Sequence, residues 1–210
     1  MNNILVIGAH FDDAELGCGG TMAKFAAQGK KVYKLTLTDN VTNFAQMSIR
    51  VGFESSLSDS GRACAVLGVQ EITDFKFAAC NYLHYSAEFM QQVEHVIYQR
   101  EIDTVFIHYD ADANQDHVEA SRICRTAARH CKNVFYYQSN GYIPEKPFHP
   151  TFFIDISDFY EKKKAALAQY HEEHNRGDRL FETALLKNAV WGYANAVSYA
   201  EGFVPLKICF

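Results

Sequence analysis

One histidine and three carboxylates lie within six residues near the start of the chain: His10, Asp12, Asp13 and Glu15. Carboxylates this close together repel one another unless a cation or a proton offsets their charge. A divalent metal ion is the natural offset, because imidazole nitrogens and carboxylate oxygens both bind zinc. We therefore predict that His10 and Asp13 bind a metal ion, in which case Asp12 stays available as a general base.

Two other interpretations of this segment compete with the metal site. A solvated acidic loop ahead of a helix would explain Asp12, Asp13 and Glu15 through capping and the helix dipole alone. Glycines after a first strand also suggest a dinucleotide-binding loop. However, Gly17-Cys18-Gly19-Gly20 lacks the spacing G-x-G-x-x-G, and acidic side chains would repel a pyrophosphate. The solvated loop therefore remains the main alternative.

A second polar cluster, from His108 to His117, follows a predicted strand over 103–107. His117 begins the next predicted helix, so a regular element fixes its position and it can supply a third ligand. Two histidines and one carboxylate with open positions are typical of catalytic zinc, or of ferrous iron in oxygenases. Asp116 is a candidate partner that orients a ligand. We interpret His108 and Asp112 as loop scaffolding.

Other segments receive weaker interpretations. The sequence His171-Glu172-Glu173-His174 is one residue short of the H-E-x-x-H spacing, so we expect a solvated helix end. The run Lys162–Lys164 is typical of a solvated face. The segment 41–53 either lines the pocket or forms a surface loop. Tyr142 and His149 lie in a stretch with glycine and proline, where aromatic rings stack on a sugar or pack under a loop.

The elements that must position these residues alternate between strands and helices along the chain. This alternation predicts an α/β fold, a three-layer Rossmann-like arrangement with a mostly parallel sheet and helices on both faces. Ligands of such sheets bind outside the carboxyl ends of the strands. We expect one domain over residues 1–210. Strands are predicted over 3–9, 31–38, 72–75, 103–107, 133–137 and 152–156, and helices over 21–28, 54–67, 87–100, 117–130, 160–171 and 180–199.

Composition excludes several classes of protein. The 210 residues carry a formal net charge of −5, which disfavours sequence-independent nucleic-acid binding. No apolar run reaches the roughly 18–20 residues of a membrane span, and Met1–Gly8 resembles a strand rather than a signal peptide. Six cysteines without a C-x-x-C pair predict free thiols and a cytoplasmic location. The 14% aromatic content is compatible with a homo-oligomer.

Taken together, the two polar clusters resemble those of the LmbE-like, or PIG-L-like, deacetylases. The segment Ala9–Glu15 with Gly19-Gly20 is similar to the family motif A-H-P-D-D-E followed by G-G. His108–His117 is similar to the family motif H-x-x-x-D-x-N-x-D-H. Weaker similarities extend the match over nearly the whole chain: Leu67-Gly68-Val69, Asp155-Ile156-Ser157 with Lys163, and Tyr199–Phe203.

The resemblance implies an LmbE-like fold and a zinc-dependent N-deacetylase, a hydrolase of linear amides that acts on N-acetylated sugars such as N-acetylglucosamine derivatives. It implies metal ligands at His10, Asp13 and His117 and a general base at Asp12. Asp116 joins Asp12 and Asn114 among the expected catalytic residues.

Two residues depart from the family pattern. Phe11 replaces a proline, which alters the loop but removes no functional group. Asn114 stands where some members have a histidine. Asparagine can donate a hydrogen bond to an oxyanion but cannot supply a proton, so Asp12 must act first as a base and then as an acid.

Two other functions stay open at this point. A non-catalytic sugar-binding module could keep the metal, and a ferrous enzyme could use the same three ligands. The sequence does not reveal whether the sugar is free, nucleotide-linked or attached to a larger scaffold.

Overall fold

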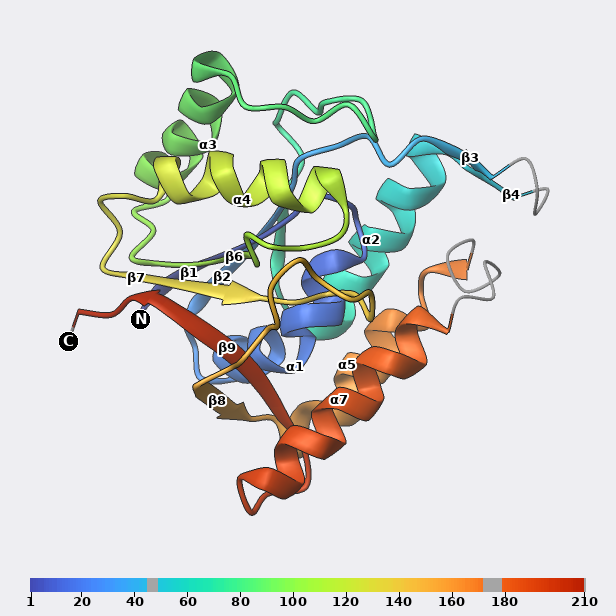
Figure 1. Cartoon of the computed structure of the whole chain (residues 1–210), viewed down its shortest axis with the longest axis vertical. Helices are drawn as coiled ribbons and strands as arrows, with labels where there is room; N and C mark the ends of the chain where they lie inside the picture. Colours follow the sequence, from blue (N-terminus) through green and yellow to red (C-terminus); the bar gives the residue numbers. More distant parts are fainter. Residues whose placement is uncertain (45–48, 172–178, 210) are drawn as a thin grey trace.

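The computed structural model describes residues 1–44, 49–171 and 179–209, and a seven-stranded sheet lies at its centre (Figure 1). The strand order in this part of the chain is β5-β2-β1-β6-β7-β9-β8. The first five strands in this order run parallel to one another. Strand β9 is antiparallel to both β7 and β8. The predicted mostly parallel sheet is therefore confirmed. The strands are β1 (Asn3–Gly8), β2 (Lys31–Thr36), β5 (Gln70–Ile72), β6 (Thr104–His108), β7 (Asn133–Tyr137), β8 (Phe152–Asp155) and β9 (Ala200–Lys207).

Helices cover both faces of this sheet, as the alternating sequence predicts (Figure 1). α1, α2, α5 and α7 lie on one face, and α3 and α4 pack together on the other. A separate antiparallel hairpin, β3–β4, projects beside α2. The bounds are α1 (Asp13–Ala27), α2 (Phe53–Leu67), α3 (Ala87–Gln99), α4 (Gln115–Ala127), α5 (Tyr160–Leu167), α7 (Leu180–Ala194), the 3₁₀ turn η2 (Ser157–Phe159), β3 (Thr42–Phe44) and β4 (Ile49–Val51).

The central strands are apolar on both sides because each side faces a layer of helices. In β6, Phe106 belongs to the core on the α1 side, whereas Val105 and Ile107 belong to the core under α3 and α4. Successive side chains of a strand point to opposite faces. A strand between two helical layers therefore reads as a continuous apolar run rather than an alternating one.

Helix α1 begins at Asp13, eight residues before the predicted start at residue 21. Glycine lowers helix propensity, but close packing requires it here. A Cβ atom at Gly17 would overlap the ring of Tyr137, and one at Gly20 would lie 2.6 Å from Ile156 Cδ1. These glycines let α1 approach β7 and the segment after β8. Tertiary contacts thus override the local preference.

The predicted helix over 180–199 is wrong at its end. Helix α7 stops at Ala194, and residues Ala200–Lys207 form β9, which the sequence did not indicate. Pro205 argues against a central strand. In the structure, however, Pro205 lies beyond the residues of β9 that pair with β8, where β9 has a partner on one side only.

The prediction of a solvated lysine face is wrong for Lys163. This side chain is fully buried and forms a 2.7 Å ion pair with the equally buried Glu201. Glu201 also accepts hydrogen bonds from the backbone N–H groups of Gly20 and Thr21, at 3.0 and 2.7 Å. Lys163 donates to the carbonyl of Leu16 at 2.8 Å. The pair therefore supplies hydrogen-bond partners to the middle of α1, and β9 is tied to that helix.

The expectation of free cysteine thiols is met within the described residues. All six cysteines are free thiols. None of the helices that the structure describes combines the length and the apolar character that crossing a membrane requires.

Candidate active site

The polar clusters meet where the direction of the sheet reverses. Strands β1 and β6 are parallel neighbours, but α1 leaves β1 on one face and α4 follows β6 on the other (Figure 1). A crevice opens at such a switch point, outside the carboxyl ends of the strands. His10 and Asp13 follow β1, and His117 lies in the first turn of α4.

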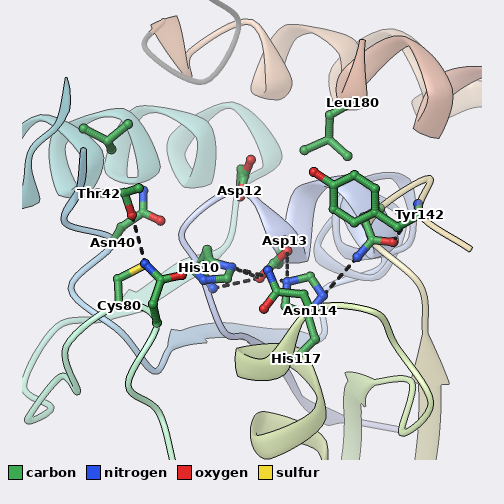
Figure 2. Close-up of a pocket in the computed structure, with 13 residues that line it drawn as sticks. His10, Asp12, Asp13, Asn40, Thr42, Cys80, Asn114, His117, Tyr142 and Leu180 are labelled. Carbon is green, nitrogen blue, oxygen red and sulfur yellow. Dashed lines mark hydrogen bonds and ion pairs between the residues drawn. The ribbon is translucent and has the colours of Figure 1, made fainter. Parts of the chain in front are cut away.

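His10, Asp13 and His117 converge on one point, as Figure 2 shows. His10 Nδ1 lies 3.3 Å from His117 Nε2 and 3.3 Å from Asp13 Oδ2, and His117 Nε2 lies 3.2 Å from Asp13 Oδ1. Zinc holds such ligands at about 2.0–2.1 Å in a tetrahedron, which places any two of them roughly 3.3 Å apart. The two oxygens of Asp13 each face one histidine, and one ligand atom from each of the three residues lies within 4.8 Å of the others. This spacing is compatible with one zinc ion held by all three side chains.

The outer nitrogen of each histidine faces a carboxylate. His10 Nε2 lies 3.2 Å from Asp116 Oδ2, and His117 Nδ1 lies 3.2 Å from Asp112 Oδ2. A proton on each outer nitrogen leaves a lone pair on each inner one. Carboxylates that orient histidines in this way are typical second partners of metal ligands. The donor set thus fits a metal ion.

The same carboxylates stabilise positive charge at this point. Burial lowers the pKa of His10, but hydrogen bonds to Asp116 and Asp13 outweigh it, so the pKa of His10 is well above its usual value. Burial also lowers the pKa of His117, but Asp13 and Asp112 raise it to about 9. Burial raises the pKa of Asp112, yet His117 lowers it to about 2.

Asp12 lies in the same pocket, beside the three converging side chains (Figure 2). Asp12, Asp13 and Glu15 expose only 5%, 3% and 0% of their surface, so the alternative of a solvated acidic loop is wrong. Asp12 occupies the N-cap position of α1 without a side-chain capping hydrogen bond. Capping therefore does not explain why this position carries a carboxylate.

Glu15 is neutralised by a lysine that sequence reasoning missed. Lys34, on β2, is fully buried and lies 2.7 Å from Glu15 Oε1. Its ammonium group also donates to Ser60 at 2.6 Å and to the carbonyl of Phe11 at 2.5 Å. Tyr170 donates to the same carbonyl at 2.7 Å. The backbone next to Asp12 is thus held from two directions.

Asn114 and Asp116 play local structural roles at the start of α4. Asn114 caps this helix, because its Oδ1 accepts a hydrogen bond from the N–H of Asp116 at 2.8 Å. Its Nδ2 is the remaining donor toward the pocket. The carboxylate of Asp116 accepts from the N–H groups of Asn81 and Leu83. Asp116 is therefore fixed beside His10 rather than beside its sequence neighbour His117.

Three residues that support His117 received no functional role from the sequence. Asp112 faces its Nδ1, and Asn140 donates to Asp112 at 2.8 Å. The ring of His108 stacks on that of His117, with centroids 4.0 Å apart. Burial and the charge of His117 lower the pKa of His108, and its Nε2 accepts from the N–H of Ala9. Both residues interpreted as scaffolding thus contact predicted ligands: Asp112 faces His117, and His108 Nε2 lies 3.2 Å from Asp13 Oδ2.

The pocket has a volume of about 160 Å³. The segment 41–53 lines it through Thr42 and Val51, and Tyr142 also contributes, whereas the exposed His149 does not. The motif His171–His174 extends outside the described residues. The full lining is His10, Asp12, Asp13, Asn40, Thr42, Val51, Cys80, Asn81, Asn114, His117, Asn140, Tyr142 and Leu180.

Fold and site together define a class: an α/β protein with a histidine–carboxylate centre at the switch point of its sheet. The chain belongs to the PIG-L family, described as GlcNAc-PI de-N-acetylase, whose family model matches residues 5–128. The resemblance to LmbE-like deacetylases is confirmed.

Two relatives carry deacetylase names. The uncharacterized deacetylase YaiS of Escherichia coli K12 is 26% identical over 80% of this chain and 90% of its own length. The diacetylchitobiose deacetylase of Thermococcus kodakarensis is 28% identical over 100% of this chain and 86% of its own length.

Solved structures share the fold over nearly the whole chain. The conserved protein TT1542 of Thermus thermophilus has a TM-score of 0.83 and 27% identity, covering 100% of this chain and 97% of that one. The N,N'-diacetylchitobiose deacetylase of Pyrococcus horikoshii has a TM-score of 0.79 and 18% identity, with 98% and 84% covered. GalB of Pseudomonas putida KT2440, a 4-carboxy-2-hydroxymuconate hydratase, has a TM-score of 0.78 and 19% identity, with 100% and 98% covered. The fold alone therefore does not define the reaction.

Proposed function

We propose that the protein is a zinc-dependent N-deacetylase that releases acetate from an N-acetylated sugar or a sugar-containing small molecule. The observation that carries the proposal is the triangle of His10, Asp13 and His117 beside the buried carboxylate of Asp12. Membership of a family described by a de-N-acetylase activity supports it.

In this proposal, His10, Asp13 and His117 hold the metal. When bound, zinc supplies Lewis acidity to the acetamide carbonyl and lowers the pKa of water to about 7. Asp12 accepts the proton of the attacking water and then delivers it to the departing amine. Asn114 Nδ2 donates a hydrogen bond to the oxyanion. Asp116 and Asp112 orient the two histidines.

The pocket supports a hydroxyl-rich substrate. Amide side chains of Asn40, Asn81, Asn114 and Asn140 line it, and each amide group both donates and accepts hydrogen bonds. Tyr142, half exposed at the rim, offers an aromatic face to the apolar side of a sugar ring.

Metal content and acetate release, measured on the same preparations, test this proposal. The wild type should hold about one equivalent of zinc and release acetate from N-acetylglucosamine derivatives. His117→Ala should lose both properties, whereas His149→Ala, a matched change at an exposed histidine outside the pocket, should keep both.

Each other outcome of this experiment has a meaning. Equal metal content in His117→Ala and the wild type would refute the ligand set. Metal-loaded wild type that binds a sugar without releasing acetate would favour a binding module. Turnover with ferrous iron but not with zinc would favour the ferrous enzyme.

A further inference from the structure

The ring of His10 stands between two groups of potential ligands. Its Nδ1 faces Asp13 and His117, while its Nε2 faces Asp116 at 3.2 Å. The thiol of Cys80 contacts the same ring. His10, Cys80 and Asp116 each offer one ligand atom, and these atoms lie within 4.8 Å of one another. In the proposed catalytic site only the first group holds the metal ion, and Asp116 orients His10.

This second group is buried and held in place. Cys80 exposes 7% of its surface and lines the pocket. Its N–H donates to Asp39 at 2.9 Å, and the next residue, Asn81, donates its N–H to Asp116 at 2.7 Å. The loop that carries the thiol is thus fixed by the carboxylate that completes the group. Figure 2 shows Cys80 next to His10, on the side of Thr42.

We propose that His10, Cys80 and Asp116 form a second metal position, selective for a thiophilic divalent ion such as Cd²⁺. A thiolate, an imidazole and a carboxylate make a softer donor set than the two histidines and one carboxylate of the first position. The thiol distinguishes this group from the first one, because sulfur ligands favour thiophilic ions over harder divalent ions. On binding, Cys80 forms a sulfur–metal bond, and both the thiol proton of Cys80 and the Nε2 proton of His10 pass to water.

Filling the second position inhibits the enzyme, and this consequence rests on the proposed deacetylase function. The incoming ion takes Nε2 of His10 and a carboxylate oxygen of Asp116 at once. The hydrogen bond that orients His10 toward the first position is then lost. Loss of such an orienting partner typically weakens metal binding or activity by about 10- to 100-fold.

The test follows cadmium–thiolate absorption in the near ultraviolet while Cd²⁺ is added, with equilibrium dialysis for affinity. All variants carry Cys209→Ser, which removes the exposed thiol. The parent should develop the absorption band with one saturating equivalent. Adding Cys80→Ser should abolish the band, and His10→Ala should weaken Cd²⁺ binding at least about 10- to 100-fold. His117→Ala, which disrupts the first position alone, should keep the band.

Absence of the band in the parent, or its survival in Cys80→Ser, would overturn the second position. Unchanged affinity in His10→Ala would overturn the shared histidine. Cys80→Ala serves as a second variant, and circular dichroism identifies any variant that fails to fold. A protein that shows the band but never releases acetate refutes the deacetylase proposal alone. One that releases acetate without the band refutes the second position alone.

Discussion

The buried ion pair of Lys34 and Glu15 makes a quantitative prediction about stability. Lys34→Met removes the cation and leaves Glu15 fully buried beside an apolar side chain. Removing one partner of a buried pair costs about 3–5 kcal/mol, because the remaining charge has no compensation. Lys34 also donates to Phe11 and Ser60, so the loss belongs at the upper end of that range. In a chain of this size, a loss of about 5 kcal/mol should lower the melting temperature by roughly 10–20 °C.

Urea unfolding of three variants isolates the cause. Lys34→Met should shift the midpoint to lower urea without a change in slope. The double variant Lys34→Met/Glu15→Gln removes both charges and should recover part of the loss. Lys164→Met, which breaks the exposed pair with Glu161, should leave the midpoint unchanged. Equal midpoints for Lys34→Met and Lys164→Met, or no recovery in the double variant, would refute the reasoning.

Three further predictions concern single carboxylates. Asp12→Ala should keep its metal and lose about 10²–10⁴-fold in kcat, and full acetate release would remove Asp12 from its proposed role. Asp112→Asn should weaken zinc binding by about 10- to 100-fold in competition with a chelator, and unchanged affinity would separate Asp112 from His117. The backbone of Asn2 and the hydroxyl of Thr104 hold the pKa of Asp103 below its usual value against partial burial. Its stabilisation is therefore present above the unfolded-state pKa and lost as pH falls through the folded-state pKa. In urea unfolding at several pH values, the free energy of unfolding of Asp103→Asn should decrease less toward acidic pH than that of the wild type. An equal decrease in both proteins would contradict this assignment.

Sequence reasoning located the residues of the site because each follows a strand whose carboxyl end is predictable. His10, Asp13 and His117 are such residues, and the parallel sheet brings them together. Their roles as ligands remain predictions. Local sequence patterns do not indicate which side chain each charged group will contact in the folded protein. Lys34 lies in an apolar strand and Asp112 in a polar loop, and only the tertiary fold brings them to Glu15 and His117.

The errors at the start of α1 and at the end of α7 have a similar origin. The glycines of α1 lower helix propensity locally, but they are needed because a Cβ atom at Gly17 or Gly20 would overlap Tyr137 or Ile156. Pro205 by itself disfavours a central strand. However, only residues 200–203 of β9 pair with β8, so at Pro205 the strand pairs with β7 alone. In both cases the deciding contact is made by a segment that is distant along the chain.

The contact of Glu201 with α1 also sets an order for folding on the ribosome. The proposed metal ligands all precede Glu201 in the sequence, so they leave the ribosome before it does. The N–H groups of Gly20 and Thr21 meet their carboxylate only after residue 201 has left the exit tunnel. The helix that begins with Asp13 is therefore completed by a residue that is synthesised 180 positions after Thr21. A nascent chain holds the ligands of the site long before it holds the finished site.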